Sequence, residues 1–143
     1  MEEIANSMSP IDSIKHRLTR YPNTRYEERD GRITVFPADD SCFEVSLSVG
    51  VDEYIVSFFG WQEHFTEPED VLNCFAFGLS EQCRLKISYR GTTPHRWTVE
   101  SMKGGRWVED STTGLLLFPF WRKREVKYFQ NRLDQYGNKE DSI

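Results

Sequence analysis

The sequence predicts a single α+β domain. In it, a largely antiparallel sheet of about six to eight strands packs with an N-terminal helix and a central buried helix. Short stretches with apolar residues at every second position predict the strands, and two stretches with helical spacing of apolar residues predict the helices. A length of 143 residues fits one core, so residues 1–143 are assigned to one domain. Residues 1–8 and 134–143 are expected to be flexible tails.

The first predicted elements are a helix over residues 9–21 and a hairpin. Ser9 is a suitable N-cap and Pro10 suits the first helical position. The apolar residues of this helix form one narrow stripe of Ile11, Ile14, Leu18 and Tyr21. The pair Asp30-Gly31 then lies between two short runs and predicts a hairpin, because both central residues of a type I′ turn need positive φ.

The next two stretches are predicted as strands. Residues 42–49 alternate strictly between apolar and polar side chains, which is typical of a strand with one solvated face. Residues 52–65 are apolar on both sides as far as Phe59, which predicts one strand that is either buried on both faces or central in the sheet. Gly60 in its middle predicts a bulge or a close backbone approach.

A second helix is predicted over residues 68–81. Thr66 and Glu69 have the spacing of a capping box, and Pro68 fits the first turn. The carboxylates of Glu67, Glu69 and Asp70 would place negative charge at the positive end of the helix dipole and so stabilise the helix. They are therefore explained without a functional role. One face of the helix collects apolar side chains, namely Val71, Leu72, Phe75 and Leu79.

The second half of the chain is predicted to be rich in strands. Strands are expected at residues 84–91, at 95–111 as a hairpin that turns at Gly104-Gly105, and at 124–133, where a short helix is the alternative. Residues 114–121 contain Pro119, which cannot donate a ladder hydrogen bond. This segment is therefore expected to be an edge, a bend or a covering segment.

Charge is unevenly distributed along this acidic chain, whose net charge is −5. The interval between Arg32 and Arg84 contains no lysine or arginine, whereas residues 84–132 carry eleven basic and four acidic residues. We expect the two halves to pair within one molecule or across a symmetric homodimer. The alternative is that one surface faces an oppositely charged partner.

Several classes of function are disfavoured by composition. The N-terminus does not resemble a signal peptide and no apolar run is long enough for a span, so we expect a cytoplasmic protein without membrane association. The three cysteines, Cys42, Cys74 and Cys83, lack metal-site spacing, so no metal or other cofactor is predicted. Residues 118–132 interleave aromatic and basic side chains, but an isoelectric point near 5.2 makes nucleic acid an unlikely partner.

His64 and Glu63 are the candidate catalytic residues. A histidine next to a glutamate can act as a general base, and Trp61 would edge an aromatic cleft around it. A single histidine without partners at fixed spacing is a weak signal for catalysis. A small enzyme that uses His64 as general base is therefore the alternative function.

The tryptophans are the stronger candidates for a binding site in a chain that is 14% aromatic. Trp97 follows Arg96 and Trp121 precedes Arg122, so on strands each pair would point to opposite faces. Trp97 and Trp107 would share an aromatic layer across a hairpin, and this layer is either core or the wall of a groove. The predicted binding residues are Trp61, His64, Trp97, Trp107, Trp121, Arg96 and Arg122.

The layout of a leading helix, antiparallel strands and a central helix in a small acidic chain resembles that of bacterial secretion chaperones. This resemblance concerns the fold, and it implies a module that binds protein partners. We therefore predict a non-catalytic, chaperone-like module or adaptor that binds a protein or peptide through an acidic, aromatic-lined surface. A cleft that brings His64 close to Glu or Cys side chains would instead favour the enzyme.

Overall fold

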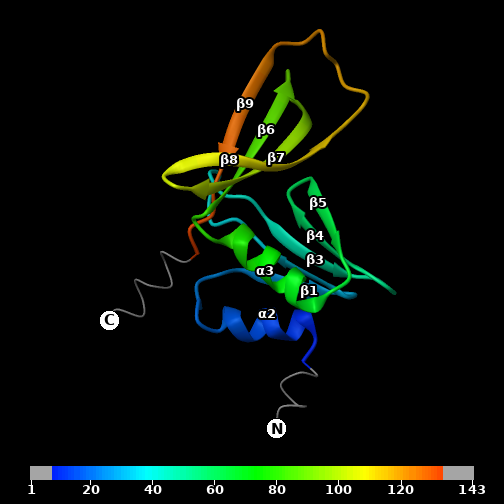
Figure 1. The fold of residues 1–143 in the computed structure, drawn as a ribbon, viewed down its shortest axis with the longest axis vertical. Helices are drawn as coiled ribbons and strands as arrows, with labels where there is room; N and C mark the ends of the chain where they lie inside the picture. The colour runs from blue at the N-terminus through cyan, green and yellow to red at the C-terminus, as the bar shows by residue number, and fades with distance from the viewer. Residues whose placement is uncertain (1–7, 134–143) are drawn as a thin grey trace.

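The computed structural model describes residues 8–133, which contain two helices and nine strands (Figure 1). It confirms the predicted α+β class and the antiparallel pairing. Apart from Met8, the predicted tails at residues 1–8 and 134–143 lie outside the described residues. The elements in chain order are α2 (Pro10–Leu18), β1 (Tyr26–Arg29), β2 (Arg32–Val35), β3 (Val45–Val49), β4 (Tyr54–Phe58), β5 (Trp61–Phe65), α3 (Pro68–Leu79), β6 (Cys83–Arg90), β7 (Thr93–Lys103), β8 (Arg106–Gly114) and β9 (Arg124–Phe129).

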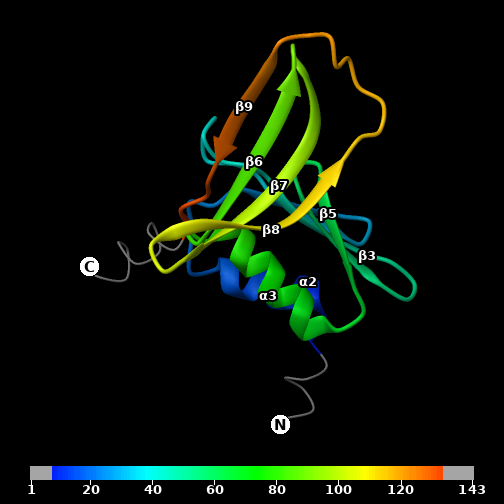
Figure 2. The same ribbon diagram turned by 45° about the horizontal axis from the view of Figure 1, so that its top comes forward.

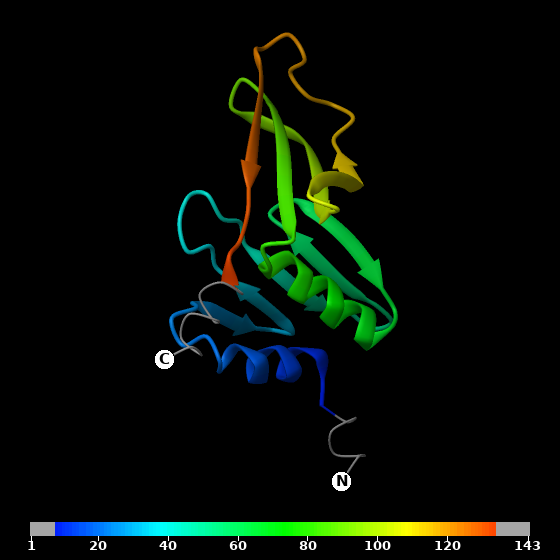
Figure 3. The same ribbon diagram turned by 60° about the vertical axis from the view of Figure 1, so that its left-hand side comes forward.

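The strands form two antiparallel sheets where the sequence predicted one. Sheet A has the order β1-β2-β3-β4-β5, so every strand pairs with its neighbour in sequence. Sheet B has the order β8-β7-β6-β9, in which the last strand crosses over to pair with β6. Helix α3 packs on β3, β4 and β5, and α2 lies beside α3, so both helices cover one end of the molecule (Figures 1 and 3). Sheet B extends away from that end.

The two sheets share one apolar core. Val56, Phe58 and Trp61 of sheet A belong to the same buried cluster as Ile87 and Trp97 of sheet B. The turned view shows β6 and β7 running from the helices towards the far end of the molecule (Figure 2). The core is therefore continuous from the helices through sheet A to the near half of sheet B.

The two predicted hairpin turns are confirmed. Asp30 and Gly31 join β1 to β2 with φ angles of 51° and 76°, as a type I′ turn requires. Gly104 and Gly105 join β7 to β8. The helix N-cap at Ser9 is confirmed too, because the Asp12 N–H donates to Ser9 Oγ at 3.1 Å.

The single strand predicted over residues 52–65 is wrong. The chain reverses at Phe59 and Gly60, whose φ angles are 42° and 115°, and β4 pairs with β5 as a tight hairpin. A Cβ atom built on Gly60 would lie 2.4 Å from Trp97 Nε1, so the hairpin tip fits closely against the Trp97 ring. Neither Asn nor Asp occupies the turn at Phe59 and Gly60, and the turn is apolar because it packs against sheet B.

The capping box predicted at Thr66 is also wrong. Helix α3 begins at Pro68, its N-cap is Glu67, and no side chain caps it. The physical reason is Pro68, because the residue before a proline is pushed into an extended conformation, here φ −102° and ψ 128° at Glu67. The proline therefore fixes the helix start at Pro68, two residues after Thr66.

This difference gives a matched pair of substitutions. Ser9→Ala is expected to lower the free energy of unfolding by about 0.5–2 kcal/mol, because it removes the bond to the Asp12 N–H. Thr66→Ala is expected to change it by less than about 0.5 kcal/mol, because Thr66 is not the N-cap of α3. Urea unfolding of both variants measures the difference. If Thr66→Ala lowered the free energy of unfolding as much as Ser9→Ala does, Thr66 would cap the helix after all.

Candidate functional site

The segment between β8 and β9 lies at the end of the molecule far from both helices (Figures 1 and 2). It exposes large apolar side chains. We call residues 115–121 the apolar loop. Leu116 and Leu117 are 96% and 91% exposed, and Phe120 and Trp121 are 68% and 72% exposed. Several large apolar side chains exposed close together make this segment the candidate interaction surface, since contiguous apolar patches are uncommon on the surface of soluble monomers.

The start of the apolar loop is tied to β7, and the chain just after its end is tied to the β6–β7 turn. The Leu115 N–H donates to the His95 carbonyl at 2.8 Å, and the Gly91 N–H donates to the Lys123 carbonyl at 2.7 Å. The Phe118 ring stacks on the His95 ring, with 4.2 Å between centroids and 10° between planes. These contacts turn Phe118 inwards and leave its neighbours facing solvent.

The middle of the loop is a compact turn around Pro119. The Phe120 N–H donates to the Phe118 carbonyl at 2.8 Å, and the Arg122 N–H donates to the Pro119 carbonyl at 3.0 Å. The rings of Phe120 and Trp121 meet edge to face at 5.4 Å. The loop therefore has a fixed path, which lowers the entropy lost when a partner binds.

Cations surround the base of the apolar loop, and we call this set the basic rim: Arg90, Arg96, Arg122, Lys123 and Arg124. Arg90 Nη1 donates to the Arg122 carbonyl at 3.4 Å, so the rim is continuous from the β6–β7 turn to the loop. Within the described residues, no member of the rim takes part in an ion pair. Their charge is left to act on solvent or on a partner.

His95 lies within this positive environment. Burial lowers the pKa of its imidazole, and repulsion from Arg90, Arg96 and Arg124 lowers it further. The Nε2 atom of His95 is buried and has no hydrogen-bond partner. The neutral imidazole is therefore the form that fits against Phe118.

The lowered pKa of His95 predicts a loss of stability in mild acid. The unfolded chain binds a proton to this histidine near its ordinary pKa of about 6.5, whereas the folded chain resists that proton until the pH is lower. The neutral His95 therefore contributes its full stabilisation at pH values above the unfolded-state pKa. This contribution is lost as the pH falls from there towards the lower folded-state pKa. We expect His95→Gln to lose less stability than the parent between about pH 7.5 and about pH 5.5 in urea unfolding. An equal loss in both proteins would contradict this assignment.

The expected pairing of the acidic and basic halves is mostly not found within residues 8–133. Asp39 and Arg132 join the two halves at 3.2 Å. The other ion pairs of the basic half stay within sheet B, namely Arg84–Glu100, Lys86–Glu109 and Lys103–Asp110. The acidic interval between Arg32 and Arg84 contains β3, β4, β5 and α3, which lie away from the basic rim (Figure 1). Charge is segregated in space as well as in sequence.

The predicted catalytic residues lie on strand β5 at the edge of sheet A. His64 Nδ1 is 2.9 Å from Glu53 Oε1, and the side chains are 54% and 47% exposed. Glu63 is exposed. Two grooves of the described residues, one between α2 and α3 and one beside the β1–β2 turn, include neither His64 nor Glu63. The contact between His64 and Glu53 is thus a solvent-exposed polar contact of low energy.

The predicted binding residues do not form one site. Trp61 and Trp97 are 3% and 9% exposed and belong to the core between the sheets, where Trp61 Nε1 donates to Ser111 Oγ at 3.2 Å. Trp107 lies elsewhere, with the Arg84 guanidinium 4.6 Å from its ring. Trp121 and Arg122 belong to the apolar loop and basic rim, and Arg96 joins them.

The aromatic layer predicted for Trp97 and Trp107 is wrong, although their strands do pair as a hairpin. Trp97 faces Thr113, and Trp107 faces Met102, five positions further along β7. A register shift between Val99 and Glu100 also changes the alternation of faces. Trp97 is therefore buried, while Trp107 is partly exposed and its ring contacts the Arg84 guanidinium.

Sequence reasoning named Trp121 and Arg122 but missed Leu116 and Leu117, because it assigned the stretch to an edge or covering role. The signal was present in the sequence as a run of apolar residues ended by Pro119 and followed by three cations. Such a run cannot join a sheet past the proline, so it must either cover the core or face solvent. Periodicity does not distinguish these two outcomes.

The three cysteines are free, and Cys74 and Cys83 are unsuited to nucleophilic chemistry. Burial raises the pKa of the Cys74 thiol to about 12, and it also raises the pKa of Cys83. Within residues 8–133, no group of three or more His, Cys, Asp or Glu side chains is arranged to hold a metal ion. In the same part of the chain, neither helix has the length and apolar character needed to cross a membrane.

Comparisons of the chain with protein-family models, curated proteins and solved structures found no match.

Proposed function

We propose that this protein is a non-catalytic binding module that engages a protein or peptide partner through the apolar loop and the basic rim. The observation that carries the proposal is the exposure of Leu116, Leu117, Phe120 and Trp121 on a loop whose backbone path is fixed. Aromatic side chains and arginines are enriched where binding energy concentrates at protein interfaces. A rigid loop loses little conformational entropy on binding, which favours affinity.

The partner is expected to offer an apolar groove flanked by carboxylates. Apolar side chains of the loop would fill the groove, while the rim cations would face the acidic flank and speed association. The compartment is part of the proposal: Cys42, Cys74 and Cys83 are free, which fits a reducing cytoplasm. The enzyme alternative has less support. Glu53 does lie within hydrogen-bond reach of His64, as that alternative requires, but both side chains are exposed and neither lines the two grooves of the described residues.

Site-specific photo-crosslinking in the native cell tests this proposal. A crosslinking residue placed at Leu116 is compared with one at Val51, which is 99% exposed in the β3–β4 turn. We expect a protein adduct from Leu116 and none from Val51. The adduct should decrease when Arg122 and Lys123 are changed to glutamate, because the rim is then repelled by an acidic partner.

Three outcomes would overturn the proposal. Equal adducts from Leu116 and Val51 would indicate non-specific contact. Adducts to lipid alone would show that the loop inserts into a membrane surface instead of a protein. Adducts to a second copy of this chain alone would make the loop a homodimer interface.

A further inference from the structure

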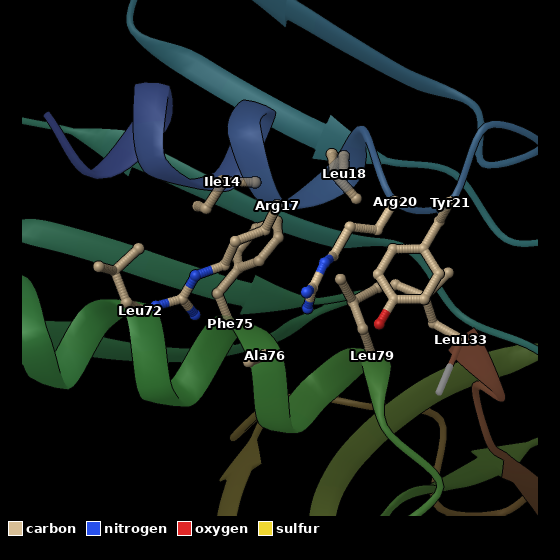
Figure 4. Close-up of a pocket in the computed structure, with 10 residues that line it drawn as sticks. All are labelled: Ile14, Arg17, Leu18, Arg20, Tyr21, Leu72, Phe75, Ala76, Leu79 and Leu133. Carbon is tan, nitrogen blue, oxygen red and sulfur yellow. The ribbon is translucent and has the colours of Figure 1, made fainter. Parts of the chain in front are cut away.

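A second apolar site lies at the opposite end of the molecule from the apolar loop, between α2 and α3. It is a groove of about 320 Å³ (Figure 4). Its floor is formed by buried residues of both helices, namely Ile14, Leu18, Phe75 and Leu79. Leu72, Ala76 and Leu133 line its sides. An apolar surface of this kind favours an aliphatic or aromatic ligand.

Two arginines and a tyrosine are the polar residues of this groove. Arg17 comes from the last turn of α2, and Arg20 and Tyr21 come from the turn that follows. Both arginine side chains extend from α2 and its following turn across the groove towards α3 (Figure 4). Within the described residues, neither guanidinium is in an ion pair.

We propose that this groove binds a carboxylate with a single medium-length acyl chain. The chain would lie on Phe75 and Leu79, and the carboxylate would accept hydrogen bonds from Arg17 and Arg20. Charge complementarity supports the headgroup, because an unpaired guanidinium beside an apolar surface is well suited to bind a carboxylate through two parallel bonds. Tyr21 could donate a further hydrogen bond through its hydroxyl group.

The dimensions of the groove favour a small ligand over a partner helix. Its volume is near the lower end of the range for small-molecule sites, which begins at about 300 Å³. Helix α2 has nine residues, so the groove runs along only a short length of helix. A docked helix needs several apolar anchors along its length, whereas one acyl chain can be held by the few apolar residues of this groove.

Isothermal titration with dodecanoate, below its micelle concentration, tests the site in the full-length protein. We expect saturable binding with one site, and no comparable binding of dodecan-1-ol or dodecylammonium, which lack the negative headgroup. Arg17→Gln with Arg20→Gln should weaken binding at least about tenfold, because charge-assisted bonds are lost. Arg106→Gln is the matched control, since Arg106 is exposed in the β7–β8 hairpin and does not line the groove.

A second variant keeps the arginines and fills the space. Ala76→Trp places a large ring on the side of the groove, so dodecanoate binding should be lost while the protein stays folded. NMR shift changes on adding dodecanoate should map to α2 and α3, which keeps the test decisive if the double arginine variant fails to fold. The proposal is wrong if dodecanol binds equally well, if Ala76→Trp binds normally, or if shifts map to residues 115–121. The last result would locate the binding at the apolar loop.

Discussion

Replacement of Phe58 by alanine is expected to lower the free energy of unfolding by about 3–5 kcal/mol. Phe58 is fully buried, and its ring lies 5.5 Å from the Phe43 ring and 4.6 Å from the Trp61 ring, measured between centroids. A Cβ atom on Gly78 of α3 would lie 2.4 Å from Phe58 Cε1, so helix and ring are in close contact. Phe58 therefore joins sheet A to α3 and to the core beneath sheet B, and its removal leaves a cavity.

The matched control for Phe58→Ala is Phe120→Ala. Phe120 is 68% exposed in the apolar loop, so its replacement should change the free energy of unfolding by less than about 0.5 kcal/mol. Urea unfolding of both variants, with equal denaturant dependence, gives the comparison. Equal losses for the two variants would mean that the apolar loop is part of the folding core.

Loss of partner binding without loss of stability is expected for Leu116→Ser combined with Trp121→Ser. Both side chains face solvent, so the fold does not depend on them. If they are central anchors of the interface, their truncation should weaken binding by at least about thirtyfold, equivalent to about 2 kcal/mol. The measurement is the dissociation constant for the partner captured at Leu116, with urea unfolding as the check on folding.

Val51→Ser controls for the removal of an exposed apolar side chain. Val51 is 99% exposed and lies in the β3–β4 turn, away from the apolar loop. Its replacement should leave both stability and partner affinity unchanged. If Val51→Ser weakens binding as much as the loop variant, the interface includes sheet A and the assignment to the loop is wrong.

The sequence predicted those elements whose signals are local. The Asp30-Gly31 turn and the Ser9 cap were predicted correctly, because each depends on residues a few positions apart. The turn at Phe59 was missed, because a phenylalanine at positive φ is unfavourable by itself. Contacts from a distant strand stabilise it: Gly60 sits against Trp97, and Phe59 lies near Phe129.

The candidate site was predicted only in part for a similar reason. Trp121 and Arg122 were named from composition, but Trp61 and Trp97 look the same in sequence and are buried. Exposure of Leu116 depends on how the loop is anchored, and the anchor is the His95 ring, which lies on another strand. Burial is a property of the tertiary fold, so neither the pattern nor the residue type could assign these side chains.

The most direct test of the proposed binding surface is an NMR titration of the isotope-labelled full-length protein with the purified partner. Shift changes should be concentrated in residues 115–124 and at His95, because His95 stacks on Phe118 and lies among the rim arginines. His64 and residues of α2 should show little change. Shifts centred on His64, or on the groove between α2 and α3, with an unperturbed apolar loop would contradict the proposed binding surface.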